Sequence, residues 1–244
     1  MRIGLLGAMI DNLNMNETVG RITAFIREGK KPRQVITLNP EYLYRAQNEA
    51  ELMRLVNEAD LITPDGAGIV WASKVAGAPV QERVTGIDLM LHLLPVAEKE
   101  GWGVFLLGSA PGVADEAGQK LKEQYPALKI VGTYHGYFTE EQAGEIVSQI
   151  KGARPVLLFV ALGMPRQEQW IDKYKEEMGV PVSMGVGGSL DVIAGRVQRV
   201  SPWLQNLQLE WLGRLIREPQ RWRRQLVLPR FAALVLKTYV FKMK

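Results

Sequence analysis

One carboxylate, Asp65, lies where a turn could put it to chemical use. The chain reads Ile-Thr-Pro-Asp-Gly-Ala-Gly from Ile62 to Gly68, so an apolar strand pattern breaks into a Pro-Asp-Gly turn before a helical pattern begins. Open α/β sheets bind ligands at the carboxyl ends of their strands, and a carboxylate held there is suited to act as a general base. Asp before Gly is also a common way to make a plain turn or to cap a helix. This stretch alone therefore leaves a purely structural role open.

Two further polar side chains, Thr37 and Asn39, follow another apolar run. They stand two residues apart in Thr-Leu-Asn-Pro-Glu, which places them on the same side of a strand terminus. Both can hydrogen-bond a sugar or a nucleotide. Both are equally suited to cap the helix that we expect to begin at Pro40.

Three loops of small residues come after other apolar runs. They are Leu107–Gly112, Gly163–Glu168 and Gly185–Asp191. The backbone amides of such loops can receive a phosphate or a ribose, and glycine allows a ligand to approach closely. None is a complete P-loop or Gly-x-Gly-x-x-Gly motif. Three in one chain nevertheless favour a crevice for a nucleotide or a nucleotide-sugar.

Metal chemistry is not predicted, and we expect no cofactor. The two histidines, His92 and His135, lie far apart in the sequence, and the chain contains no Asp-x-Asp pair to hold Mg²⁺ or Mn²⁺ under a diphosphate. His92 falls in a helical stretch, which favours a structural role. His135 follows a strand pattern among aromatic residues that could stack on a base, although loop packing is the plainer interpretation.

The elements that must position these residues alternate between strands and helices. Strand runs without polar alternation indicate strands covered on both faces, and helices between them indicate parallel crossovers. We therefore expect an α/β, Rossmann-like layered fold with a mostly parallel sheet. The predicted strands are Ile3–Ala8, Val35–Leu38, Leu61–Ile62, Val104–Leu107, Ile130–Val131, Val156–Ala161 and Val182–Val186; the predicted helices include Glu17–Glu28, Gly86–Lys99, Val113–Tyr125, Glu140–Ile150 and Arg166–Met178.

The composition is that of a globular protein. The chain has 244 residues, of which 47% are hydrophobic and 23% charged, enough to bury a sizeable core. The absence of cysteine excludes disulfides and thiol nucleophiles and fits a reducing compartment. No signal peptide and no apolar run of about 18 residues is evident, so the cytoplasm is the expected location.

The pattern changes at Ser201-Pro202, where a helix is predicted and no strand follows. We expect an α/β catalytic domain over residues 1–199 and a helical appendage over residues 200–244. Pro219 and Pro229 should divide the appendage, with a last helix from Phe231 to Phe241.

The basic charge of the chain is concentrated in this appendage. Residues 200–244 carry nine basic and two acidic side chains, a net charge of +7, whereas the preceding residues carry 21 basic and 24 acidic ones, a net charge of −3. Arginine grips phosphate with two parallel hydrogen bonds, and several arginines here recur at spacings of three and four. A solvated basic face is the plain alternative. Aromatic residues among the arginines favour contact with an anionic membrane surface, and self-association of the apolar helices off the membrane is a further use.

Several motifs together resemble the WecG/TagA/CpsF family of bacterial glycosyltransferases, and the match runs along the whole chain. They are Thr37–Glu41, Thr63–Gly66, Glu82–Gly86, His135–Phe138, Gly163–Glu168, Gly185–Gly188 with Asp191, and Glu210–Pro219. The resemblance implies an inverting transferase that moves N-acetylmannosamine from a UDP donor to N-acetylglucosamine on a polyprenyl diphosphate. A uronic acid donor or another UDP-hexose stays open. The enzyme would work at the inner face of the bacterial cell membrane, in the assembly of teichoic acid or a related cell-wall glycan.

The resemblance also implies roles for particular residues. Asp65 would deprotonate the acceptor hydroxyl. Thr37, Asn39, Arg83 and Gln167 would line the pocket. The appendage would close over the pocket and neutralise the diphosphate through Arg214, Arg221 and Arg224. The nucleotide is expected at Gly108, Ser109, Tyr137, Gly187 and Asp191.

Two other classes of function compete with a transferase. A nucleic-acid-binding module would use the appendage as its basic patch, but it leaves the Pro-Asp-Gly turn without a role. A nucleotide-sugar hydrolase or epimerase would use the crevice without a lipid. We expect no nucleic-acid partner.

Overall fold

The centre of the molecule is a six-stranded sheet. The computed structural model describes residues 1–200 and 226–241. The strands are β3 (Arg33–Leu38), β4 (Leu61–Pro64), β5 (Gly103–Gly108), β6 (Lys129–Tyr134), β7 (Leu157–Ala161) and β8 (Val182–Gly185), in the order β4-β3-β8-β7-β5-β6. Every neighbouring pair is parallel, so all six carboxyl ends meet at one edge. The predicted α/β layered fold with a mostly parallel sheet is confirmed.

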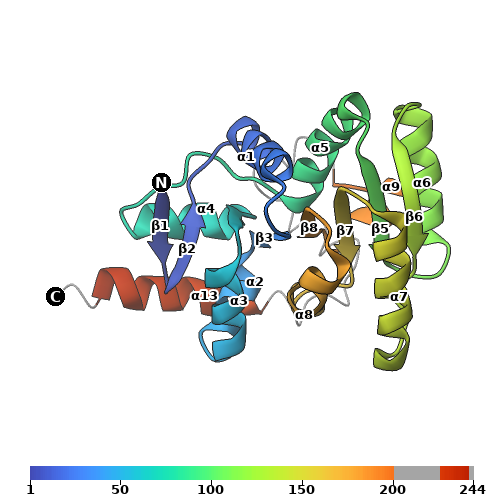
Figure 1. Ribbon diagram of the computed structural model, residues 1–244. Helices are drawn as coiled ribbons and strands as arrows, with labels where there is room; N and C mark the ends of the chain where they lie inside the picture. The colour runs from blue at the N-terminus through green and yellow to red at the C-terminus, as the bar shows by residue number, and fades with distance from the viewer. Residues whose placement is uncertain (201–225, 242–244) are drawn as a thin grey trace.

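Helices cover both faces of this sheet (Figure 1). One face is covered by α1 (Met15–Glu28), α5 (Gly86–Glu100), α6 (Val113–Gln124) and α9 (Ser189–Ile193). The other face is covered by α2 (Pro40–Ala46), α3 (Ala50–Glu58), α7 (Glu140–Ala153) and α8 (Arg166–Met178), with α4 (Ala67–Val75) beyond α2. Neighbouring strand residues point to opposite faces, as the fully buried Val35 and Ile36 do, which explains the continuous apolar runs.

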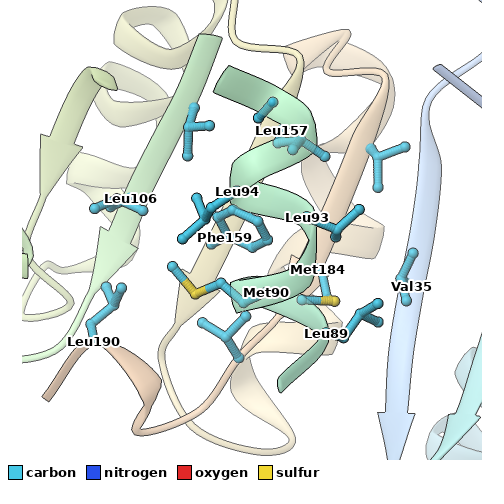
Figure 2. Close-up of a cluster of buried hydrophobic side chains, with 14 of the residues drawn as sticks. Val35, Leu89, Met90, Leu93, Leu94, Leu106, Leu157, Phe159, Met184 and Leu190 are labelled. Atoms are coloured by element: carbon cyan, nitrogen blue, oxygen red, sulfur yellow. The ribbon is translucent and has the colours of Figure 1, made fainter. Parts of the chain in front are cut away.

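Helix α5 forms the largest part of the first layer. Its buried face packs on β5, β7 and β8 through Met90, Leu93 and Leu94, against side chains such as Phe159 and Met184 (Figure 2). The helix is capped at its start by Thr85, whose hydroxyl accepts a hydrogen bond from the Asp88 amide at 3.3 Å. This packing and cap fix the first turn of α5 over the carboxyl edge of the sheet.

The first predicted strand, Ile3–Ala8, is wrong. The chain instead forms an antiparallel hairpin of β1 (Arg2–Leu5) and β2 (Ala8–Asp11), which is not part of the six-stranded sheet. Leu6 and Gly7 both have positive φ, +48° and +86°, and they make a two-residue turn in the middle of the apolar run. The hairpin lies beside β4, where the Asp11 carboxylate accepts a hydrogen bond from the Ile62 amide at 2.9 Å.

The described end of the chain forms α13 (Val227–Leu236), followed by a short π-helical turn η2 (Lys237–Phe241). The helix begins four residues before the predicted Phe231, and Pro229 lies in its first turn, where a missing N–H costs no helix bond. Helix α13 packs against α2 and α4 with Phe231 and Val235 buried (Figure 1). At 2.7 Å the Tyr239 hydroxyl accepts a hydrogen bond from the amide of Leu6 in the hairpin turn. Within residues 1–200 and 226–241, no helix is both long and apolar enough to span a membrane.

Candidate active site

Asp65 lies directly after β4, at the carboxyl edge of the sheet. Its amide donates a hydrogen bond to the carbonyl of Leu38 at 2.9 Å, so the turn is tied to the neighbouring strand β3. The Asp65 carboxylate accepts a hydrogen bond from the amide of Gly86 at 3.3 Å. Gly86 is the first residue of α5, and the first amides of a helix have no partner within the helix and favour negative charge. The half-buried carboxylate is therefore held against the start of α5.

The segment before α5 is fastened to the end of β4. The amide of Val84 donates to the carbonyl of Pro64 at 2.9 Å, and the Thr63 hydroxyl donates to the carbonyl of Val84 at 3.1 Å. These two bonds place the partly buried Arg83 next to the Asp65 turn. The segment that carries Arg83 is thus held at the same edge as the Asp65 turn, and the role of Arg83 in lining the pocket stays a prediction.

Thr37 and Asn39 belong to the same edge. A Cβ atom added to Gly86 would lie 3.3 Å from the Thr37 hydroxyl oxygen, so the first turn of α5 passes close above Thr37. Asn39 caps α2, because its side-chain oxygen accepts a hydrogen bond from the Tyr42 amide at 2.9 Å. The capping role expected for Asn39 is confirmed, and its contact with a substrate stays a prediction.

Gln167 closes the site from the side of β8. It lies in the first turn of α8 and is buried, with 4% of its surface exposed. Its side-chain oxygen accepts a hydrogen bond from the Gly187 amide at 3.0 Å, and its amide nitrogen lies so close to Gly185 that an added Cβ would be 2.5 Å away. The carbonyl of Gly185 in turn lies 3.7 Å from the position of a Cβ on Gly86. Gln167 and Asp65 therefore flank the contact between the end of β8 and the start of α5.

The residues expected to hold a nucleotide gather further along the edge. The Ser109 hydroxyl donates to the Asp191 carboxylate at 2.8 Å, which joins the end of β5 to α9. Gly108 has a φ of +132°, and a Cβ there would lie 2.4 Å from the carbonyl oxygen of Ala161. Only glycine fits this approach between β5 and β7. Gly187 also has positive φ, at +53°, and follows β8 in the same group of loops.

The aromatic segment after β6 is adjacent to these loops. The amide of Gly136 donates to the carbonyl of Ser109 at 2.8 Å. Tyr137 is 73% exposed and free to stack on a planar group. The neighbouring His135 packs its ring 4.7 Å from that of Tyr134 and receives a hydrogen bond from the Tyr137 amide at 3.3 Å. These contacts support a loop-packing role for His135.

Other residues singled out from the sequence lie elsewhere. His92 is exposed on α5, where its Nδ1 is 2.8 Å from the carbonyl oxygen of Asp88 one turn earlier, a local structural contact. Arg214, Arg221 and Arg224 lie outside the described residues. Among the described residues, no three His, Asp or Glu side chains are grouped so that they could hold a metal ion.

One ionisable residue of the site is absent from the sequence-based prediction. Glu168 follows Gln167 on α8 and is 2% exposed, and its Oε1 accepts a hydrogen bond from the Gln167 amide nitrogen at 2.7 Å. Burial raises the pKa of the Glu168 carboxyl to about 7. The sequence shows two polar residues at the start of a helix, and only the packing of α8 on β3 and β8 reveals that both point inward.

Comparison with known proteins identifies the family of this chain. A sequence model of the glycosyl transferase WecG/TagA/CpsF family matches residues 3–244. The chain therefore belongs to the WecG/TagA/CpsF family of glycosyltransferases. The family predicted from the motifs is thus confirmed, and the enzyme class with it.

Individual members of this family are similar along most of their length. A protein of Bacillus spizizenii is 37% identical over 203 residues, which cover 83% of this chain and 78% of the relative. One from Bacillus subtilis is 35% identical over 226 residues, 93% of this chain and 88% of the relative. A third, from Staphylococcus aureus strain MW2, is 33% identical over 237 residues, 97% of this chain and 92% of the relative. All three are called N-acetylglucosaminyldiphosphoundecaprenol N-acetyl-beta-D-mannosaminyltransferase.

Proposed function

We propose that this glycosyltransferase moves N-acetylmannosamine from UDP-N-acetylmannosamine to N-acetylglucosamine carried on undecaprenyl diphosphate. Relatives at 33–37% identity that are called N-acetylglucosaminyldiphosphoundecaprenol N-acetyl-beta-D-mannosaminyltransferase support the choice of sugar and acceptor. The product belongs to the linkage unit of wall teichoic acid. The observation that carries the chemistry is the carboxylate of Asp65, held at the carboxyl edge of the sheet by the first amide of α5.

The reaction is a direct displacement that inverts the anomeric carbon. The acceptor hydroxyl oxygen forms the new bond to the anomeric carbon while the bond from that carbon to the diphosphate oxygen breaks. The hydroxyl proton passes to Asp65, and UDP leaves with the electron pair of the broken bond. A carboxylate can serve as this base because the acceptor is held in line, which lowers the barrier more than the strength of the base does.

Two groups of residues along the edge would bind different parts of the two substrates. The nucleotide would lie against the loops that contain Ser109, Asp191, Gly108 and Gly187, and Tyr137 would offer a stacking surface. Thr37, Asn39, Arg83 and Gln167 line the sugar and the acceptor. Hydroxyl, amide and guanidinium groups of this kind are the usual partners of sugar hydroxyls and phosphates.

We propose that protein cations, and not a metal ion, neutralise the charge of the leaving diphosphate. Arg214, Arg221 and Arg224 precede α13 in the sequence, and α13 is docked on α2 and α4, which begin just after Asn39 and Asp65. Bidentate arginine contacts can stabilise a developing diphosphate charge. The acceptor carries a lipid, so we place the enzyme at the inner face of the membrane as a peripheral protein.

The Asp65→Asn variant tests the base. With a short-chain polyprenyl-diphosphate N-acetylglucosamine as acceptor, the wild type should form a β-linked disaccharide from UDP-N-acetylmannosamine, and the variant should be slower by at least about 100-fold. UDP binding, measured by calorimetry, should be nearly unchanged, because the proposed role of Asp65 is to take the acceptor proton and not to hold the nucleotide. Asp172→Asn on the outer side of α8 is the control and should retain turnover.

Two results would contradict the proposal. Wild-type turnover by Asp65→Asn would remove the base assignment. Faster transfer from the corresponding uronic acid donor or from another UDP-hexose would leave the transferase in place and change its sugar.

A further inference from the structure

Glu168 is a buried carboxyl that the proposed reaction does not use. It is the only buried Asp or Glu in the part of the chain that the structure describes. A buried charge normally has a partner of opposite sign, since removing a carboxylate from water is costly. No lysine or arginine among the described residues forms an ion pair with it. Burial without a counter-charge among the described residues therefore favours the protonated form of the Glu168 side chain.

The contacts of Glu168 fix the orientation of Gln167. The Gly187 amide is a donor, so the atom of Gln167 that receives it at 3.0 Å must be the side-chain oxygen. The amide nitrogen of Gln167 then faces Glu168 and donates to its Oε1 at 2.7 Å. Glycine at position 185 leaves the space that this pair occupies, because a Cβ there would lie 2.9 Å from the same oxygen of Glu168. Glu168 thereby sets which face of Gln167 is turned to the end of β8.

Glu168 also reaches toward the helix that carries Asn39. Tyr42, which donates its amide to the Asn39 cap, is 1% exposed. Burial and, secondarily, a charge on Glu168 raise the pKa of the Tyr42 phenol. The Tyr42 hydroxyl and the second carboxyl oxygen of Glu168 are both buried, and neither has a hydrogen-bond partner within residues 1–200 and 226–241. The hydrogen bond from the Gln167 amide offsets a negative charge on Glu168 only in part, because burial has the larger effect on the pKa of this carboxyl.

Charged groups on the surrounding elements are engaged elsewhere. On β3, Arg33 pairs with Asp60 at 2.8 Å and with Glu28 at 3.2 Å. Arg54 on α3 binds Asp172 of α8 at 2.9 Å, as well as Glu51 and Glu58. On α7, Glu140 is paired with Lys173 of α8.

We propose that Glu168 is a positioning residue that works as a neutral carboxylic acid, orienting Gln167 and through it the Gly185–Gly187 end of β8 against the start of α5. It touches no reacting atom and acts through Gln167. This proposal rests on the proposed transferase function, because its catalytic effect is read in sugar transfer. Ionising Glu168 would force the enclosure to admit water or to shift α8, and either change would move Gln167.

Glu168→Gln is the decisive variant, because glutamine keeps the acceptor oxygen but cannot ionise. Its transfer rate at pH 6.5 should be within about twofold of the wild type. As the pH rises to 8.5, the rate of the wild type relative to Glu168→Gln should fall at least about threefold, since one titrating group is then mostly charged. Glu168→Ala removes the acceptor and should be about tenfold slower at both pH values. Glu176→Gln, an exposed carboxyl on the same helix, is the control and should follow the wild type.

A second measurement needs no substrate and so separates this proposal from the choice of donor. The melting temperature of Glu168→Gln should rise relative to the wild type as the pH increases from about 4.5 to about 7, and the difference should then stay constant. If the wild type and Glu168→Gln showed the same pH dependence of transfer rate and of melting temperature, the proposal would be overturned. Full activity of Glu168→Ala would overturn it as well. Absence of transfer by the wild type, with the melting difference present, would instead count against the donor assignment alone.

Discussion

At the scale of single residues, the site is built from side chains that also hold the backbone. The side-chain oxygen of Asn39 caps α2, and the carboxylate of Asp65 accepts a hydrogen bond from the first amide of α5. A loss of activity on substitution therefore has two sources, the missing contact with substrate and the displaced element. These two sources can be separated only where a replacement keeps the structural hydrogen bond and removes the contact with the substrate.

Asn39 offers such a replacement. Asn39→Ala removes the cap of α2 and should cost about 1 kcal/mol of folding stability, with a loss of transfer activity. Asn39→Ser restores an N-cap hydroxyl and should recover most of that stability. The serine variant should remain slow, since its hydroxyl is too short to reach where the amide nitrogen does. Denaturant unfolding and the transfer assay measure the two effects, and full activity of the serine variant would reduce Asn39 to a capping residue.

The sequence predicts these residues unevenly, for a physical reason. Asp65, Thr37 and Asn39 stand at turns, where the local sequence already shows the end of a strand and the start of a helix. Glu168 stands inside a helix, and its burial depends on the strands on which α8 packs, which are distant in the sequence. Local sequence patterns thus predict the residues at the sheet edge, whereas the enclosure behind Gln167 depends on the tertiary structure.

At the scale of elements, the parallel strands were predictable because each is buried on both faces. The hairpin β1–β2 was not, because its apolar run has the composition of a core strand and only Gly7 marks the turn. The position of α13 was not predictable either. Its apolar residues fit a membrane face and a packed face equally well, and the contacts with α2 and α4 decide that Phe231 and Val235 are packed.

The docking of α13 predicts that this helix is coupled to the proposed active site at the carboxyl edge of the sheet. Phe231 lies over Gly68, where an added Cβ would be 3.9 Å from its ring and 2.5 Å from Pro40, the first residue of α2. Phe231→Ala should destabilise the protein by about 3 kcal/mol and lower the transfer rate, because it loosens the contact between α2 and α4. Phe241→Ala is the matched control, since that ring is 70% exposed and its loss should leave stability unchanged. Equal melting temperatures for the two variants would contradict the packed position of α13.

At the scale of the whole molecule, charge is separated along the chain. The residues before Val200 are net −3 and those from Val200 onward are net +7. The acidic part carries the sheet and the proposed active site at its carboxyl edge, whereas the basic part includes α13, which is packed on that same body. Removing the whole appendage would expose the surface that Phe231 and Val235 cover, so truncation cannot distinguish membrane contact from folding. Substitution of the charged side chains alone can distinguish membrane contact from folding.

Replacing Arg214, Arg221 and Arg224 together by alanine tests whether the basic part joins the lipid-linked substrate to the site. We expect turnover with the polyprenyl-diphosphate acceptor to fall at least about tenfold, since each lost arginine removes a charge-assisted contact with the diphosphate. Sedimentation with anionic vesicles should weaken too, and the wild type should lose that binding as salt increases. The control replaces three exposed lysines of the α/β body, Lys99, Lys122 and Lys151, and removes the same charge. If both triple variants lost vesicle binding and turnover equally, the effect would belong to net charge, and the arginines would have no specific place at the site.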